Sequence, residues 1–533
     1  ASGGAPYQVQ LAFADGGRPD LAVTSSLQGL ALGLPAPLDK AAPASLPLRV
    51  AFGPLPGEGN QARDQVGVDL GLAASPLLSV RLERDVSGAE ARVLRGAYAL
   101  GTGPATLASR GVSARVALAA LDADAWDAWA SRPSGAGGSA GGAIEQAQGY
   151  WPTQLSASVD RLRVANRDLH RVRAEAQLDG RQWRTRIDAE ELGGRIDYRP
   201  PEGSGAQLAP GRIFARLSHL KLEKSAANDV DQLLRHQPAS VPALDVVIDR
   251  LSLGARELGR LELEAVNRPV EGVGSANEWR LNRFGLEVPE ARLSGSGNWT
   301  TVGASQAGPG GAARRTALNL HLDIRDAGAL LERFGSAGVV RGGKGTLEGN
   351  VGWLGSPLSL DTPSLSGQLK LDVERGQFLK ADPGLAKLLG VLSLQTLPRR
   401  LMLDFKDVFS EGFAFDFVRG DARIDKGVAS TNNLQMKGVN AAVLLEGQAD
   451  IARETQDIHA VVVPELNAGT ASLIASAINP AVGLGTFLAQ FLLRQPLQEA
   501  ATQQFHISGR WDDPQVERVA RKPAVAPGPL PSQ

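Results

Sequence analysis

The chain has 533 residues, and its 56 basic and 57 acidic side chains give a formal net charge of -1 at pH 7. This balance, together with the absence of any Lys or Arg run, argues against a nucleic-acid-binding protein. The absence of Cys excludes disulfides and thiolate metal sites. At this length we expect several domains or one long repetitive body, and 62 Gly with only 5% aromatic residues favour the repetitive body.

The first segment, residues 1–130, is expected to be β-structure. Between residues 66 and 118 apolar and polar residues alternate, which is the pattern of strands with one buried face. A short helix is predicted after them, because Asp122 and Asp124 stand where the N-cap and first-turn acids of a helix belong. A calcium loop formed by Asp122, Asp124 and Asp127 is the alternative, but no Gly turn and no distal Glu ligand complete it.

An internal repeat follows a Gly- and Ser-rich segment, 131–149, that has the composition of a flexible linker. The residues from Leu155 align without a gap with those from Leu244, at a constant offset of 89 positions. We therefore expect residues 150–300 to form two repeated β units within an array that extends along one axis. A single short helix, 226–237, is predicted between the two copies.

Alternation within the repeats and the later strands defines one apolar face. The residues expected to line it are Val172, Ala174, Ala176, Leu178, Leu261, Leu263, Leu320, Leu322, Leu369 and Leu371. Their sequence neighbours, such as Arg173, Glu175, Glu262 and Lys370, are assigned to the opposite, solvated face.

The C-terminal part is expected to comprise residues 314–519, after a second Gly-rich link at 301–313 and before a disordered tail at 520–533. A helix is predicted from Asp326 to Phe334, ended by Gly335. The glycines of GGKGTLEG, at 342–349, do not follow the P-loop order and predict a hairpin turn.

An uncharged stretch of 28 residues runs from Leu466 to Leu493. Asn479-Pro480 interrupts it, so we predict a hairpin of two short apolar helices at 470–493, together with another apolar helix at 383–397. Neither half of the hairpin is long enough to span a bilayer. The hairpin is expected either to be buried in a core or to contact a membrane, and the residues expected to make that contact are Leu473, Ile474, Ile478, Phe487, Leu488, Phe491 and Leu492.

The sequence contains no recognisable catalytic or metal-binding motif. Its six His residues are scattered singly, with no HExxH spacing, and there is no GxSxG nucleophile elbow. We therefore predict no enzyme activity, no metal and no cofactor.

Several segments resemble the C-terminal region of the YhdP family, a group of AsmA-like proteins of Gram-negative envelopes that is related to TamB. They include the block from Leu388 to Gly427, the repeated VDRL and IDRL units, and the ending FHISGRWDDPQVERV. The resemblance extends from about residue 60 to residue 519. It implies a β-groove with an apolar interior that passes phospholipid between the inner and outer membranes. It also implies a periplasmic location and an inner-membrane anchor upstream of the sequence given.

The expected fold is accordingly all-β: an elongated, curled antiparallel sheet that forms a groove, built from repeated multi-strand units with a few short helices. Too few helices are predicted to cover the apolar face of so many strands, so the sheet must close, curl or be filled. Stacked at about 4.8 Å, the strands would extend on the order of 100 Å. The alternative is a scaffold β-array of the cell envelope, whose apolar face is packed by its own side chains and holds no transported ligand.

Overall fold

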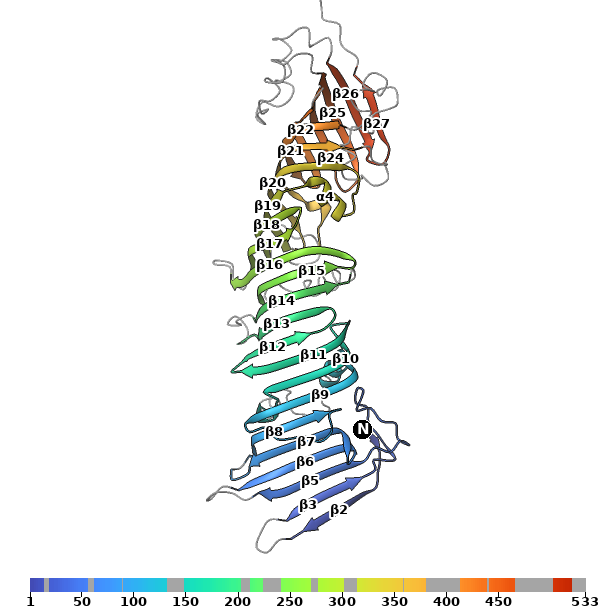
Figure 1. Ribbon diagram of the computed structural model, residues 1–533, viewed down its shortest axis with the longest axis vertical. Helices are drawn as coiled ribbons and strands as arrows, with labels where there is room; N and C mark the ends of the chain where they lie inside the picture. The colour runs from blue at the N-terminus through green and yellow to red at the C-terminus, as the bar shows by residue number, and fades with distance from the viewer. Residues whose placement is uncertain are drawn as a thin grey trace, which may run out of the picture. The chain divides into compact units, whose positions relative to one another are not determined.

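The computed structural model consists almost entirely of β-strands (Figure 1). It describes the chain except for residues 14–18, 56–61, 89, 132–147, 203–210, 224–240, 270–276, 302–313, 358, 380–412, 439–440, 465–501 and 520–533. The chain divides into two compact units. Unit 1 comprises residues 1–203, 211–222 and 246–250, and unit 2 comprises residues 204–210, 223–245 and 251–533.

In unit 1 each strand of the main sheet pairs with the next strand of that sheet in chain order. These strands are β2 (Tyr7–Ala12), β3 (Asp20–Ser25), β5 (Leu48–Leu55), β6 (Arg63–Leu72), β7 (Ser75–Asp85), β8 (Arg92–Leu100), β9 (Gly111–Asp122), β10 (Gln154–Val164), β11 (Arg167–Asp179), β12 (Gln182–Asp188), β13 (Leu192–Arg199) and β14 (Arg212–Leu222). Two short strands, β1 (Ser2–Gly3) and β4 (Leu30–Ala31), pair separately. The strand β15 (Ala243–Leu253) is divided between the units.

The prediction of a wholly antiparallel sheet is wrong at two places, because β8 pairs with β9 and β9 pairs with β10 in parallel. Parallel neighbours require a connection that returns the chain to the same end of the sheet. Residues 101–110 make the first return, and the backbone N–H of Ala105 donates to Ser79 Oγ over 3.0 Å. The second connection contains α1 (Ala123–Ala130) and the 3-10 turn η1 (Gln148–Tyr150).

The helix α1 is confirmed with the predicted N-cap. The side chain of Asp122 accepts a hydrogen bond from the backbone N–H of Ala125 at 2.8 Å. Asp124 binds the β10–β11 turn instead, accepting from the N–H groups of Ala165 and Asn166 at 2.6 and 2.8 Å. Both turn residues have positive φ, as a tight hairpin turn requires. Two of the three acids considered for a calcium loop therefore have structural roles.

Two glutamates from the β12–β13 turn contact the segment of β11 around Arg171, whose backbone φ is positive. Glu191 accepts from the backbone N–H of His170 at 2.8 Å and contacts the His170 Nδ1 at 2.7 Å. Glu190 forms an ion pair with Arg171, which has a φ of 52°. The hydrogen bond to the Glu191 carboxylate raises the pKa of His170.

Unit 2 contains a sheet in which every strand is antiparallel to its neighbours in chain order. Its strands are β16 (Arg256–Pro269), β17 (Asn277–Val288), β18 (Ala291–Thr301), β19 (Arg314–Ile324), β20 (Val340–Leu354), β21 (Ser366–Phe378), β22 (Phe413–Asp425), β23 (Val428–Gly438), β24 (Ala441–Asp450), β25 (Thr455–Pro464), β26 (Gln503–Arg510) and β27 (Pro514–Arg518). A short 3-10 turn, η4 (Thr362–Ser364), precedes β21.

The helix predicted before β20 is confirmed as α4 (Ala327–Arg333). The side chain of Asp326 caps its N-terminus by accepting from the N–H of Ala329 at 3.0 Å. At the other end, Arg333 donates two hydrogen bonds of 2.7 Å to the Glu290 carboxylate in the β17–β18 turn. These contacts hold α4 against one end of the strands.

The hairpin predicted at 342–349 is wrong, because these residues lie inside the single strand β20. Gly342 and Gly343 have positive φ, so they distort the strand without reversing it. A Cβ atom at Gly345 would overlap the carbonyl oxygen of Asp372 in β21. The physical reason for this glycine is therefore the close approach of two strands.

Several other predictions fall outside the described residues: the helices at 226–237, 383–397 and 470–493, and the tail at 520–533. Within the part of the chain that the structure does describe, none of the helices has both the length and the apolar character needed to span a membrane.

We expect His170 to titrate above its ordinary pKa of about 6.5, because its imidazolium donates to Glu191. A folded-state pKa above the unfolded value means that this pair stabilises the fold fully below about pH 6.5 and loses its effect as the pH rises through the folded pKa. NMR titration of His170 should show this shift, and Glu191→Gln should abolish it. Glu264→Gln, which changes a glutamate of unit 2, should leave the titration unchanged. An unaltered titration in the Glu191 variant would show that the pair does not form.

We expect Gly345→Ala to destabilise unit 2 by about 1–3 kcal/mol, because its methyl group must displace the backbone of β21. Gly285→Ala is the matched control, since a Cβ there would meet only the Glu262 Cβ at an ordinary 3.7 Å. Thermal unfolding followed by circular dichroism measures both. A Gly345 variant as stable as the Gly285 variant would contradict the close approach.

Candidate functional site

Strand register in unit 1 brings the predicted lining residues onto one face. Val172 pairs with Val159, and Ala174 lies between Ala157 and Ile187. In the next rows Ala176 lies between Leu155 and Thr185, and Leu178 pairs with Trp183. Because in-register partners share a face, these side chains form continuous apolar rows across β10, β11 and β12.

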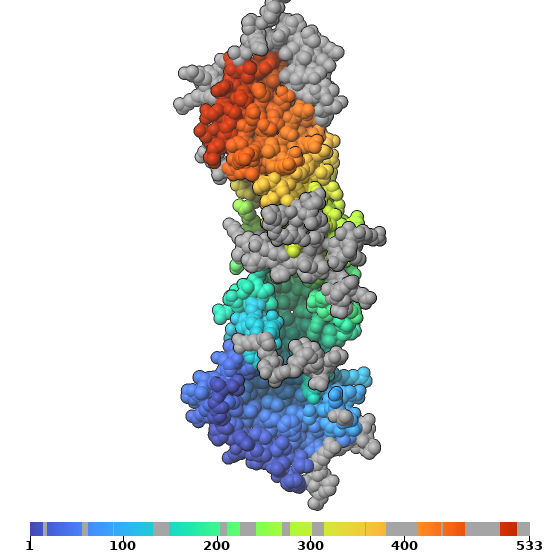
Figure 2. Space-filling model, turned by 180° about the vertical axis from the view of Figure 1, so that it is seen from behind, coloured from blue at the N-terminus to red at the C-terminus, as the bar shows by residue number. Residues whose placement is uncertain are grey.

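The two faces of these strands differ in exposure. Ala174, Ala176 and Leu178 are half-buried, whereas Arg173 and Glu175 are exposed. Only Val172, at 1% exposure, is fully buried among the four predicted lining residues of β11. In Figure 2 the strands coloured cyan to green are hollowed along their middle. Among the residues that the structure describes, these apolar rows are therefore only partly covered.

The apolar face of unit 1 is covered at one end of strands β5 to β8. Leu48, Leu70, Leu78 and Leu100 form one row there, and residues 27–46 pack on it. Trp126 of α1 belongs to the same cluster, and its Nε1 donates to the Ala36 carbonyl at 3.1 Å. This cover closes one edge of the apolar face.

A polar cluster marks the other end of β6 and β7. Arg84 and Asp64 form a bidentate ion pair of 2.9 and 2.6 Å, and both side chains are about one-fifth exposed. Hydrogen bonding to Asp64 raises the pKa of Arg84, which also contacts the Tyr150 hydroxyl at 3.5 Å. The sequence analysis missed this cluster. A signal for it exists, because Arg84 follows Leu78, Val80 and Leu82 in the apolar register of β7.

Unit 2 places all six of its predicted lining residues in two neighbouring rows. One row contains Leu261, Leu286, Leu293, Leu322, Leu347 and Leu371. The other contains Leu263, Phe284, Gly295, Leu320, Gly349 and Leu369. The six predicted residues are all half-buried. These rows form the accessible middle of the apolar face of β16 to β21.

Fully buried residues flank these open rows on both sides. Toward one end of the strands, Trp279, Trp299 and Trp353 share a row with Thr316 and are at most 9% exposed. Toward the other end the buried residues are Val288, Ala291 and Val373. We call this band of half-buried rows between buried margins, on the apolar face of β16 to β21, the trough, and its half-buried rows the floor.

The apolar face closes in the last strands of unit 2. Fourteen residues form a buried cluster there, two of them from β21 (Val373 and Phe378) and the others from β22 to β26. Among them Phe415, Met436, Val443 and Phe505 are at most 5% exposed. In β24 the consecutive residues 441–445 are all buried, so both faces of that strand are covered. This part of the sheet has a packed core rather than a trough.

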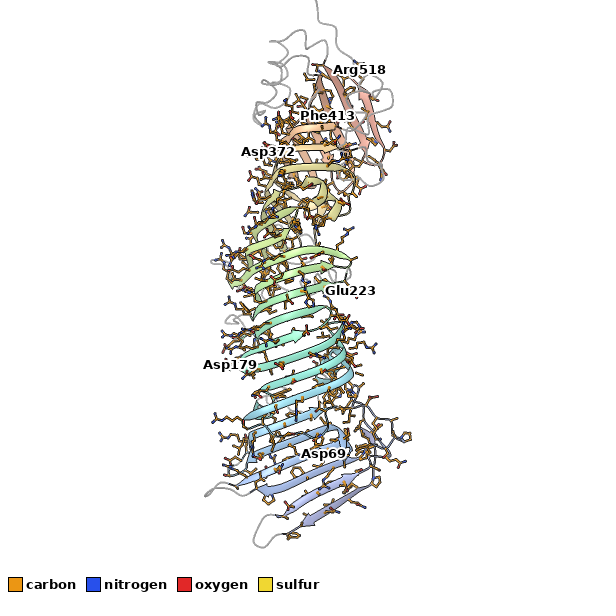
Figure 3. All side chains as sticks on the ribbon, in the orientation of Figure 1. Asp69, Asp179, Glu223, Asp372, Phe413 and Arg518 are labelled. Atoms are coloured by element: carbon orange, nitrogen blue, oxygen red, sulfur yellow. The ribbon has the colours of Figure 1, made fainter. Side chains whose placement is uncertain are left out.

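The opposite face of unit 2 is polar. Lys370 pairs with Glu348 at 3.5 Å, and His321 contacts Asp323 at 3.1 Å. Asp372, labelled in Figure 3, lies on the same polar face, in register with Thr346. Arrangements of this kind are solvated cross-strand pairs, which do not require a ligand.

The predicted membrane-contacting residues, from Leu473 to Leu492, lie outside the residues that the structure describes.

Comparison with known proteins gives a family match over nearly the whole chain. The family described as "YhdP protein" matches residues 1–516. The intermembrane phospholipid transporter YhdP of Escherichia coli (strain K12) is 31% identical over 239 residues, which is 45% of this chain. The match covers 18% of the length of that relative. No solved structure matches the chain.

Proposed function

The chain belongs to the YhdP family, and from this premise we propose that its apolar faces carry the acyl chains of phospholipids between the inner and outer membranes of a Gram-negative envelope. The relative that is 31% identical is named an intermembrane phospholipid transporter. Family membership confirms the resemblance found in the sequence. The transport role of this chain is our proposal, because the match covers 18% of that relative.

The observation that carries the proposal is the accessible floor of the trough in β16 to β21. Leu320, Leu322, Leu369 and Leu371 are only half-buried although they lie between fully buried edges. Hydrocarbon placed there would gain about 0.8 kcal/mol for each methylene removed from water. Acyl chains have no hydrogen-bonding groups, so such a path needs neither catalytic residues nor a cofactor.

The scaffold alternative requires an apolar face that is filled by its own side chains. The buried cluster formed by the end of β21 and by β22 to β26 fits that description. The half-buried rows of β10 to β12 and of β16 to β21 do not fit it. Transport therefore accounts for more of the described surface than a scaffold does.

The proposal also covers how the chain meets the membranes. It places the chain in the periplasm, with an inner-membrane anchor upstream of the sequence given and the outer membrane as the other contact. Residues 470–493, helped by 383–397, would contact a membrane, because uncharged stretches of this length are costly to expose to water. The repeats in 150–300 and the region 314–519 would supply successive parts of the path.

Photo-crosslinking tests where lipid lies. We expect a photoreactive residue at Ala176, Leu320 or Leu371 to capture phospholipid, because these positions lie on the apolar face. The same residue at Arg173 or Lys370, on the polar face, should not. Mass spectrometry of the crosslinked protein identifies the adduct. Equal capture on both faces would contradict a lipid path along the apolar face.

A charge on the floor of the trough should block transport. We expect Leu371→Arg to reduce phospholipid transfer between donor and acceptor vesicles by about tenfold or more, because desolvating an unpaired charge costs several kcal/mol. Asn319→Arg adds the same charge on the exposed polar face and should transfer lipid normally. Circular dichroism establishes that both variants fold. A folded Leu371 variant with full transfer would show that lipid does not pass this position.

A further inference from the structure

The polar face of β12 to β14 carries a dense group of basic side chains, on the side of the sheet opposite the apolar rows. Two aspartates, Asp188 and Asp197, share this face on the same strands. We call the basic group the arginine patch, and its members are Arg184, Arg186, Arg195, Arg199, Arg212 and Arg216. Six cations against two anions make a local excess of positive charge in a chain whose net charge is -1.

Strand pairing compensates only part of this patch. Arg184 lies in register with Asp197, and Arg186 lies in register with Glu175 of β11 on one side and with Arg195 on the other. Arg195 also lies in register with Arg216, and Arg199 with Arg212. Like charges directly opposite each other on neighbouring strands are destabilising. The Arg195–Arg216 and Arg199–Arg212 pairs therefore cost the sheet stability, which an anionic partner would offset.

Half of the patch is already occupied by contacts within the chain. Arg195 makes a bidentate pair with Asp197 at 2.8 and 2.6 Å, which lowers the pKa of that aspartate. Arg184 contacts Asp179, labelled in Figure 3, at 2.8 Å, and the Arg216 guanidinium lies 4.0 Å from the Phe214 ring centre. The contacts of Arg195 and Arg184 show that guanidinium groups of the patch bind carboxylates.

The other half has no such partner. Arg186, Arg199 and Arg212 are exposed, and each lacks an ion pair with any residue that the structure describes. Guanidinium groups bind carboxylates through two parallel hydrogen bonds, so these three can take up external carboxylates.

The surface at the patch is concave. A depression of about 840 Å³ contains Arg184, Arg186 and Arg195 in its wall, together with Glu175 and Gln177. A second depression, of about 340 Å³, is lined by Arg195, Arg199 and Arg212 with Gln182, Phe214 and Asp197, the carboxylate that Arg195 already binds. Their walls offer amide groups as well as guanidinium groups, which suits an extended chain with several polar side chains.

We propose that the arginine patch binds an acidic, extended segment of a partner protein. Adjacent strands are about 4.8 Å apart, so Arg199 and Arg212 are close neighbours, whereas Arg186 lies in register with Arg195, about 14 Å along β13 from Arg199. Carboxylates spaced along an extended segment can span that distance. A uniformly anionic bilayer is a poorer fit, because Asp188, Asp197 and Glu175 would be repelled by it. The patch faces away from the apolar rows, so partner binding and lipid transport can occur together.

A labelled peptide of alternating Glu and Ser tests the proposal on the whole chain by fluorescence anisotropy. We expect binding that weakens as salt is added, and a loss of about tenfold or more in the triple variant Arg186→Glu, Arg199→Glu, Arg212→Glu. The matched control reverses three exposed arginines elsewhere, Arg110, Arg341 and Arg423, and should bind like the unmodified chain. If the charge reversal impairs folding, the triple variant Arg186→Gln, Arg199→Gln, Arg212→Gln replaces it in the same measurement.

Four results would overturn the proposal. The first is that the unmodified chain does not bind the peptide at low salt, and the second is that the patch variant binds it as tightly as the unmodified chain. The third is that the control triple variant loses as much affinity as the patch variant, which would indicate non-specific attraction. The fourth is that vesicles containing phosphatidylglycerol bind through these arginines while the peptide does not, which would assign the patch to a membrane surface.

Discussion

The two-residue period of the β-strand is the constraint on which the rest of this structure depends. Each strand sends alternate side chains to opposite faces, and in-register pairing carries that division from one strand to the next. Val172 and Ala174 therefore stand among apolar neighbours, while Arg173 between them stands among polar ones. A shift of one residue in any strand would exchange the faces, so the same register that forms the sheet also creates the apolar surface.

An apolar surface of this kind remains accessible only if its edges are closed and its middle is not. Large buried side chains, such as Trp299 and Trp353, fill one edge of the trough in unit 2. Glycines among the leucines, such as Gly295 and Gly349, leave the floor without bulk where the backbones of neighbouring strands approach closely. Further along the chain, Phe415 and Phe505 fill the same face completely, and the trough gives way to a packed core. Side-chain volume thus decides which parts of the apolar face are packed and which are only partly covered.

The two faces can serve separate purposes because apolar and polar side chains lie on opposite sides of the same described strands. Apolar rows on one face suit hydrocarbon, because its transfer out of water is favourable and needs no hydrogen-bonding partner. On the other face of β12 to β14, repelling arginines such as Arg186 and Arg195 suit carboxylates. Neither surface needs to move for the other to be used.

The sequence alone determined which residues share the apolar face, the caps of α1 and α4, and the family, because these depend on residues close together in the chain. Alternation predicted that Leu320 and Leu371 lie on one face, and Asp122 and Asp326 predicted where α1 and α4 begin. Only the tertiary structure decided the parallel pairing of β8, β9 and β10, since alternation is the same in parallel and antiparallel strands. It also decided that Gly345 serves a close contact with β21, and that Asp64 meets Arg84 on an apolar face. The arginine patch became visible last, because its members are spread over residues 184–216 and only strand register brings them together.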